Sequence, residues 1–126
     1  MPNFVKRFQD LDTYKCAFKF QQEIFRITKS RPKEEPYALT DQIRRSSRSI
    51  GANLAEAWAK RRYEAHFLSK LTDSDGELQE TYHWIETARQ CDYISPESHS
   101  ELLQRGSEVG RLLGRMIMDS DQFVTS

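Results

Sequence analysis

The chain contains few of the residues that cross-link or interrupt a small fold. Its 126 residues include only two cysteines, four prolines and five glycines. This scarcity of glycine and proline argues against a protein of strands and tight turns, which needs both at its turns. The two cysteines, Cys16 and Cys91, are expected in a first and a third helix, about 20 Å or more apart, which excludes a disulfide between them.

Long apolar runs are also missing. No stretch approaches the roughly 20 apolar residues of a membrane-spanning helix. The first ten residues, MPNFVKRFQD, lack the apolar segment of a secretory signal. We therefore expect a cytoplasmic protein with no membrane partner. Its length is that of one domain, large enough to close a core without disulfides or metals.

Apolar residues recur with the period of amphipathic helices. Apolar content is 37% and charged content 30%, as is typical of slender helical bundles, in which each helix presents a wide face to water. Four such segments with short links predict an all-α fold, a single-domain, antiparallel up-down-up-down four-helix bundle over residues 1–126. The expected helices span about 11–29, 39–60, 64–90 and 96–119, and the tail, 120–126, is expected to be loose.

The helix boundaries rest on different signals. Pro32 and Pro36 separate the first two helices, because proline interrupts a helix. The pair Ser95-Pro96 is a strong start for the fourth helix, an N-cap followed by proline at the first helical position. The break near residues 61–63 has neither glycine nor proline and is inferred from a change in the phase of the apolar residues.

The first predicted helix is apolar on two faces. One face carries Leu11, Tyr14, Lys15, Phe18, Gln22 and Phe25, and the opposite side carries Cys16, Phe20 and Ile27. Two apolar faces indicate two partners, a core and a further contact. We assign the second contact to self-association, because closed homo-oligomers are common. The predicted oligomer interface joins Phe20 and Ile27 to a small-residue side of the second helix: Gly51, Ala52, Ala55 and Ala59.

Charge is balanced in total but uneven along the chain. Residues 26–70 hold eleven bases and five acids, whereas residues 71–126 hold four bases and eleven acids. The basic side chains could bind the phosphates of a nucleic acid, or they could pair with the acidic half. Trp58 and Tyr63 lie nearby in the sequence and could stack on bases. The candidate nucleic-acid-binding residues are Arg44, Arg45, Arg48, Lys60, Arg61 and Arg62.

No set of residues indicates catalysis, a metal, a cofactor or a small-molecule substrate. Glu80-Thr81-Tyr82-His83 has the spacing of a di-iron ligand pair, but a second such pair is missing, and Glu80 and His83 face away from the apolar stripe of their helix. Neither a nucleophile motif nor a glycine-rich phosphate loop is present. We expect the acidic residues of this helix, Asp73, Asp75, Glu77 and Glu80, to pair with nearby arginines.

Two segments of the second helix resemble the signature of a bacterial family. These are Tyr37 with residues 39–45 (LTDQIRR) and residues 49–56 (SIGANLAE). The similarity extends back to residues 8–11 and 32–35 and forward through Glu77, Glu80 and Thr81, so it covers nearly the whole chain. The family is that of the four helix bundle proteins, also called 23S ribosomal RNA intervening-sequence or S23 proteins. Many members have proline where this chain has Gly51 and glycine where it has Ala57.

The resemblance implies a homopentamer of four-helix bundles with no established enzymatic activity. The family's genes were noticed inside ribosomal RNA intervening sequences, and a related accessory protein of diversity-generating retroelements is a basic pentamer that binds nucleic acid. The resulting prediction is a non-enzymatic homo-oligomer, associated with RNA through the basic surface of the second helix. The alternative is a homo-oligomeric scaffold that binds protein partners and contacts no nucleic acid.

Overall fold

Four long helices make up most of the protein. The computed structural model describes residues 5–29 and 38–124. Within these ranges there is no strand, and none of the helices combines the length and apolarity that a membrane crossing requires. The predicted link containing Pro32 and Pro36 lies mostly outside the described residues. The long helices are α1 (Asp12–Thr28), α2 (Ala38–Ala59), α3 (Glu64–Gln90) and α4 (Pro96–Met118), and two short 3-10 helices are η1 (Phe8–Asp10) and η2 (Ser120–Gln122).

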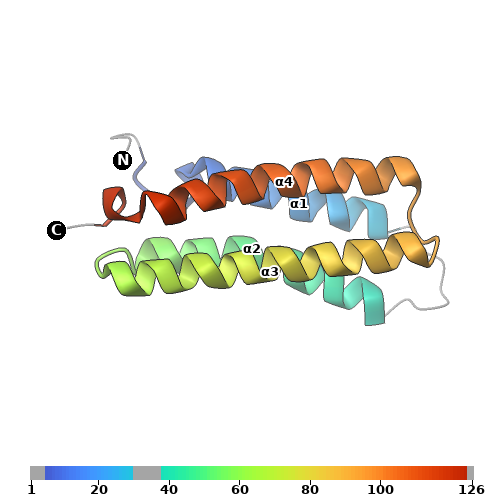
Figure 1. Ribbon diagram of the computed structural model, residues 1–126, viewed down its shortest axis with the longest axis horizontal. Helices are drawn as coiled ribbons and strands as arrows, with labels where there is room; N and C mark the ends of the chain where they lie inside the picture. Colours follow the sequence, from blue (N-terminus) through green and yellow to red (C-terminus); the bar gives the residue numbers. More distant parts are fainter. Residues whose placement is uncertain (1–4, 30–37, 125–126) are drawn as a thin grey trace.

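The helices are arranged in two layers of two. Helices α1 and α4 form one layer and α2 and α3 the other, and each helix runs antiparallel to the one before it (Figure 1). Contacts join α1 to α2, α2 to α3, α3 to α4, and α4 back to α1. The all-α, up-down-up-down four-helix bundle predicted from the sequence is therefore confirmed. The α2–α3 turn lies at the same end of the bundle as the start of α1 and the end of α4 (Figure 1).

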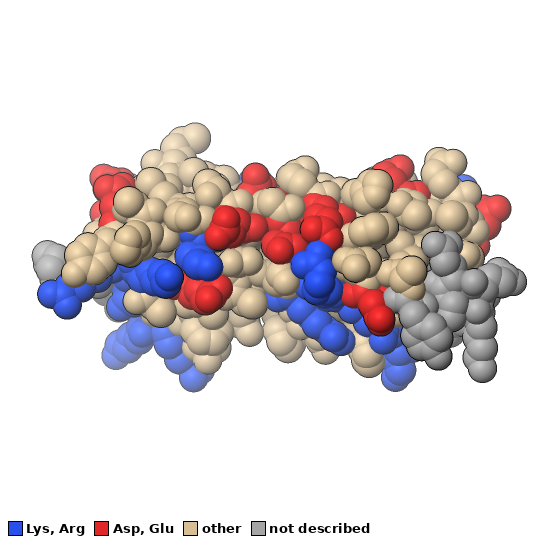
Figure 2. Space-filling model, turned by 90° about the horizontal axis from the view of Figure 1, so that it is seen from below, with Lys and Arg blue, Asp and Glu red and all other residues tan. Residues whose placement is uncertain are grey.

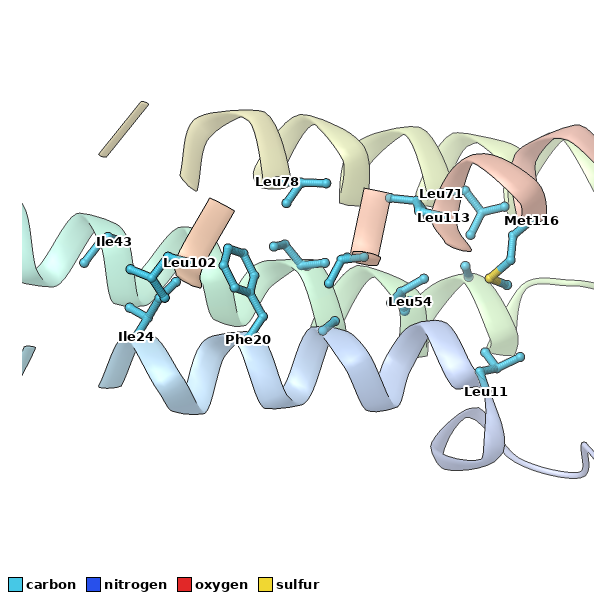
Figure 3. Close-up of a cluster of buried hydrophobic side chains, with 14 of the residues drawn as sticks. Leu11, Phe20, Ile24, Ile43, Leu54, Leu71, Leu78, Leu102, Leu113 and Met116 are labelled. Atoms are coloured by element: carbon cyan, nitrogen blue, oxygen red, sulfur yellow. The ribbon is translucent and has the colours of Figure 1, made fainter. Parts of the chain in front are cut away.

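The core runs along the whole bundle axis, and all four helices contribute to it. Side chains such as Phe20, Leu54, Leu78 and Leu113 are almost completely inaccessible to solvent. Figure 3 shows these layers of leucine, isoleucine and phenylalanine pointing inward between the helices. Burial of apolar surface at about 25 cal/mol per Å² is the main stabilising term for such a fold.

Small polar residues line the seam between α2 and α3. The Thr81 hydroxyl lies 2.9 Å from the Ser46 hydroxyl, and the Ser74 hydroxyl donates to the carbonyl of Ile50 at 2.9 Å. Ser46, Ser74 and Thr81 are fully buried, so their hydrogen bonds remove the cost of placing hydroxyls away from water. Because these side chains are short, they allow the two helix backbones to approach closely.

The connection between α3 and α4 satisfies the end of one helix and the start of the next in different ways. Before α4, the Ser95 hydroxyl accepts a hydrogen bond from the Ser98 amide at 3.0 Å, the cap that Ser95-Pro96 predicts. At the end of α3, the Asp92 amide bonds the Arg89 carbonyl and the Tyr93 amide bonds the Ala88 carbonyl, a Schellman arrangement. Asp92 has a φ of 58°, in the left-handed region that helix C-termini commonly use.

Residues 120–124 of the predicted loose tail pack against the bundle. Ser120 is buried, and its hydroxyl donates to Oε2 of Glu64 at 2.8 Å. The Phe123 ring stacks on Phe67 with ring centroids 5.8 Å apart. The tail therefore packs on the first turn of α3. Packing of the Phe123 ring and the hydrogen bond of Ser120 offset the chain entropy that favours fraying at a terminus.

The apolar faces of α1 are the reverse of those predicted. Its buried residues are Thr13, Ala17, Phe20, Ile24 and Thr28, whereas Phe18 is 44% exposed and Tyr14 and Phe25 are half-buried. The predicted core face carries Lys15 and Gln22, which are exposed. Burying them would leave a charge and an amide without water, so the face without charge turns inward.

Candidate nucleic-acid interface

The predicted basic residues form two separate groups on α2 and the turn that follows it. Arg44, Arg45 and Arg48 lie on the first half of the helix, and residues 60–62 lie just beyond its end. At 1.5 Å per residue, the twelve positions from Arg48 to Lys60 separate the groups by about 18 Å. Figure 2 views the α2–α3 face, where basic side chains gather along the lower part and acidic ones follow the middle.

Arg45 is paired with carboxylates of α3. Its guanidinium forms ion pairs with Glu77 at 3.3 Å and with Glu80. Glu80 also accepts a hydrogen bond from Nε1 of Trp84 at 3.1 Å. The Trp84 hydrogen bond, followed by that from Arg45, lowers the pKa of Glu80. The predicted pairing of the acidic helix with nearby arginines therefore holds for Arg45, and its charge is largely compensated within the bundle.

Arg44 and Arg48 are held in a different way. Both guanidinium groups lie over the Phe25 ring of α1, with Arg44 at 4.7 Å and Arg48 at 5.8 Å from the ring centroid. Nε of Arg44 donates to the Thr28 hydroxyl at 2.9 Å. Among residues 5–29 and 38–124, neither arginine has a carboxylate within ion-pair distance. The Phe25 ring thus positions both guanidinium groups, and no described carboxylate compensates their charge.

A shallow depression connects these arginines to the small residues of α2. It is lined by Asp41, Arg44, Arg45, Arg48, Ser49 and Ala52. Asp41 is the only acidic residue in the lining. The depression therefore presents guanidinium groups around an open surface, an arrangement suited to the oxygens of a phosphate.

The second basic group contains one arginine with a structural role. The Arg61 guanidinium stacks on the Trp58 ring at 3.9 Å, and its Nη1 donates to the Trp58 carbonyl at 2.8 Å. Trp58 is only 6% exposed, so Arg61 covers the side chain rather than leaving it open to a base. Arg62 and Lys60 are exposed, and Arg62 lies 5.9 Å from the Tyr63 ring centroid.

The predicted oligomer-interface residues do not share one surface. Phe20 is completely buried in the core, so its assignment to a subunit contact is wrong. Gly51 is also buried, and a Cβ there would lie 3.3 Å from the Tyr14 ring, which shows that Gly51 faces α1. Ile27 is half-buried against the core. The small residues that face outward are Ala52 and Ala59, which are exposed, and Ala55, which is partly exposed.

Sequence reasoning missed an aromatic row on the outside of α1. Phe8 contacts Tyr14 edge-on at 4.9 Å, and Tyr14 lies 6.0 Å from Phe18, measured between ring centroids. Phe25 continues the row beneath the arginines of α2. In the sequence this row is the stripe of Tyr14, Phe18 and Phe25, which the helical pattern predicts to face the core. Its lysine and glutamine marked it as the outer face.

The Glu80–His83 pair lies on the outer side of α3. Glu80 is engaged by Arg45 and Trp84, and the His83 ring packs edge-on against Trp84 at 4.8 Å. Within the described ranges, no group of three or more histidine, cysteine, aspartate or glutamate side chains is placed to hold a metal ion. Of the four acids predicted to pair with arginines, Glu77 and Glu80 do so through Arg45, whereas Asp73 pairs with Lys70 and Asp75 accepts a hydrogen bond from Gln79.

Comparisons with known proteins match this geometry to one family. No curated protein matches the chain significantly. A crystal structure of a protein of unknown function from the S23 ribosomal protein family of Bacteroides thetaiotaomicron VPI-5482 superposes with a TM-score of 0.76. The two chains are 28% identical, and the match covers 84% of this chain and 95% of the other. The model of the family described as 23S rRNA-intervening sequence protein matches residues 9–115. The chain therefore belongs to the 23S rRNA-intervening sequence protein family.

Proposed function

We propose that this protein is a non-enzymatic, cytoplasmic homo-oligomer that associates with structured RNA through Arg44 and Arg48 on α2. The observation that carries the proposal is the contrast between neighbouring arginines. Arg45 is neutralised by Glu77 and Glu80, whereas the described residues offer Arg44 and Arg48 an aromatic ring and no carboxylate. The description of the family, which refers to the intervening sequence of 23S ribosomal RNA, is consistent with an RNA partner.

Phosphate contacts of this kind give binding a steep salt dependence. Each phosphate neutralised by an arginine releases condensed counterions, so affinity falls as salt rises. Contact with the Phe25 ring holds the two guanidinium groups in place, and among the described residues only Thr28 accepts a hydrogen bond from them, from Nε of Arg44. Two fixed guanidinium groups one helical turn apart favour recognition of a backbone shape over recognition of a base sequence.

The test is binding of a labelled RNA hairpin followed by fluorescence anisotropy across a salt series. We expect clear binding near 50 mM salt, and a lower salt slope, by about one per residue, for Arg44→Gln and for Arg48→Gln. Arg115→Gln is the matched control, because Arg115 is exposed on α4, which lies diagonally opposite α2. Absence of binding at low salt, or equal slopes for all three variants, would rule out this mechanism.

A second candidate is a scaffold for protein partners that contacts no nucleic acid. The pairing of Arg45 with Glu77 and Glu80 favours it, because it compensates part of the basic surface within one subunit. This candidate requires that the purified oligomer bind no RNA at low salt. The same anisotropy experiment therefore separates the two functions.

We propose that subunits associate through the outer face of α1 and α2, and the family resemblance makes a pentamer the expected assembly. This face joins the exposed Phe18 ring to the small side chains of Ala52, Ala55 and Ala59. A monomer would leave this apolar surface open to water. Light scattering should give a particle five times the 14.8 kDa of one chain.

Variants of this face test the assembly directly. Phe18→Glu and Ala55→Glu should each reduce the particle mass. Met118→Glu is the control, since Met118 is 83% exposed at the end of α4 and away from this face. Unchanged mass for both interface variants would show that subunits meet elsewhere.

A further inference from the structure

The turn between α2 and α3 presents an aromatic ring to solvent among cationic side chains. Tyr63 is 58% exposed, more than any other large aromatic residue described. Its ring centroid lies 5.5 Å from that of His66 and 5.9 Å from the guanidinium carbon of Arg62. An exposed ring flanked by a cation and a second ring is the arrangement on which unpaired bases stack.

The charge around this ring is positive. Lys60 and Arg62 are exposed, and within the described ranges neither lies within ion-pair distance of a carboxylate. Of the two nearest acids in the sequence, Glu56 pairs with Lys70 at 3.4 Å, whereas Glu64 accepts from Ser120 at 2.8 Å and keeps its charge. The three bases Lys60, Arg61 and Arg62 therefore outweigh one acid at this turn. Lys60 and Arg62 are therefore available to phosphates on either side of a base held at Tyr63.

The backbone at this turn adds donors of its own. Tyr63 is the extended N-cap of α3, and its side chain makes no capping hydrogen bond. The first amides of α3 consequently have no acceptor from the side chain at the cap position. Trp58 is excluded as the stacking ring, because it is buried and covered by Arg61.

We propose that the α2–α3 turn binds an unpaired nucleotide of RNA, with the base on Tyr63 and the flanking phosphates at Lys60 and Arg62. This inference rests on the proposed RNA association and adds a preference to it. Arg44 and Arg48, about 24 and 18 Å from Lys60 along α2, contact the backbone of a structured region. The turn recognises a neighbouring single-stranded segment of the RNA. The preferred ligand is therefore a double-stranded RNA stem with an unpaired extension.

The experiment compares three RNAs that share one hairpin stem. The first is blunt, the second carries a short uridine tail, and the third carries an abasic tail of the same length. The two tails have equal numbers of phosphates, so the difference between their affinities reports the bases alone. Because stacking on an aromatic side chain is worth about 1–3 kcal/mol per base, we expect the uridine tail to bind at least about fivefold tighter than the abasic tail.

Substitutions of the turn then assign this preference to the ring. Tyr63→Ala should abolish the difference between uridine and abasic tails and leave the affinity for the blunt stem unchanged. Tyr63→Phe keeps the ring and should retain the difference, and Met118→Ala removes an exposed apolar side chain elsewhere and should retain it as well. Arg62→Gln should weaken binding of both tailed RNAs and lower their salt slope by about one.

The outcomes separate this inference from the function beneath it. If wild-type protein binds the blunt stem but does not distinguish the two tails, the turn is not a nucleotide site and the backbone contact of Arg44 and Arg48 stands. If Tyr63→Ala keeps the preference, the base stacks elsewhere and the inference is wrong. If no RNA binds near 50 mM salt, the inference and the proposed function both fail. Circular dichroism and light scattering of each variant verify that fold and assembly are intact.

Discussion

The Tyr82 ring of α3 lies over Gly106 of α4 and leaves no room for a side chain there. A Cβ atom at Gly106 would stand 2.6 Å from Cε1 of Tyr82 and 2.9 Å from its hydroxyl oxygen. Gly106 is buried and Tyr82 is half-buried. Glycine at this position thus sets the distance between the two helices.

Replacing Gly106 should destabilise the bundle even though alanine favours helix. At Gly114, where an added Cβ would meet no atom of the described residues within 4 Å, alanine should stabilise by up to about 1 kcal/mol. Gly106→Ala must displace the Tyr82 ring, at a cost of about 1–3 kcal/mol. Urea unfolding should therefore find Gly106→Ala less stable than Gly114→Ala. When both substitutions are made in a Tyr82→Ala background, this difference in unfolding free energy should disappear. A difference that persists would show that the Tyr82 ring is not its cause.

Phe20 and Phe18 provide a test of which face of α1 is buried. Phe20 is fully buried, so Phe20→Ala should reduce the free energy of unfolding by about 3–5 kcal/mol. Phe18→Ala should cost less than about 1 kcal/mol in the folding of one subunit. A larger loss at Phe18 should vary with protein concentration, as expected for a subunit contact. Equal, concentration-independent losses in urea unfolding would contradict the assignment.

The ion pair between Arg45 and Glu80 should make stability depend on pH. The hydrogen bond from Trp84, with that from Arg45, lowers the pKa of Glu80 below its usual value of 4.5. Such a group stabilises the folded state above its unfolded pKa, and the contribution is lost as pH falls through the folded pKa. Arg45→Gln should therefore cost up to about 1 kcal/mol at neutral pH, because the pair is largely exposed, and progressively less in acid.

Urea unfolding of wild type and Arg45→Gln over a pH series checks this expectation. Arg48→Gln is the control, because the described residues give Arg48 no carboxylate partner whose protonation could change its effect. A stability difference for Arg45→Gln that stays constant into acid would mean that the ion pair contributes nothing.

The left-handed conformation of Asp92 predicts opposite effects for two substitutions. Glycine adopts a φ of 58° without steric cost, so Asp92→Gly should stabilise by about 0.5 kcal/mol even though the exposed ion pair with Arg89 is lost. A β-branched side chain is strained there, and Asp92→Val should destabilise by about 1–2 kcal/mol. Thermal unfolding that ranked valine above glycine would contradict the backbone geometry.

Helical periodicity predicted the core of α2, α3 and α4 because each has one apolar stripe. The stripe that runs at helical spacing from Leu39 to Ala57 in α2 and the one from Phe67 to Ala88 in α3 are buried. It failed on α1, where the outer face carries three aromatic rings and the true core face has only two large apolar residues, Phe20 and Ile24. Thr13, Ala17 and Thr28 are small and add little to an apolar count, yet they let neighbouring helices approach. Residue size and nearby charge, rather than aromatic content, distinguished the two faces.

The sequence predicted which residues of the candidate site are charged, but not how these residues are arranged in space. Sequence alone indicated that α2 is basic and α3 acidic, and it left open whether they pair. The outcome depends on which side of α2 each arginine occupies. Arg45 points toward α3 and is paired, whereas Arg44, one residue earlier, lies over α1. Consecutive side chains on a helix point about 100° apart, so the partner of each arginine depends on how α2 is rotated within the bundle. The sequence alone does not give that rotation.

The contact between the tail and α3 also sets an order in which the fold can be completed. Ser120 and Glu64 are 56 positions apart, and Phe123 reaches back a similar distance to Phe67. During synthesis, the first turn of α3 emerges from the ribosome long before the residues that cover it. A nascent chain that ends within α4 therefore exposes the Phe67 edge that Phe123 covers, a surface for chaperones or for premature contact between neighbouring chains on one messenger RNA.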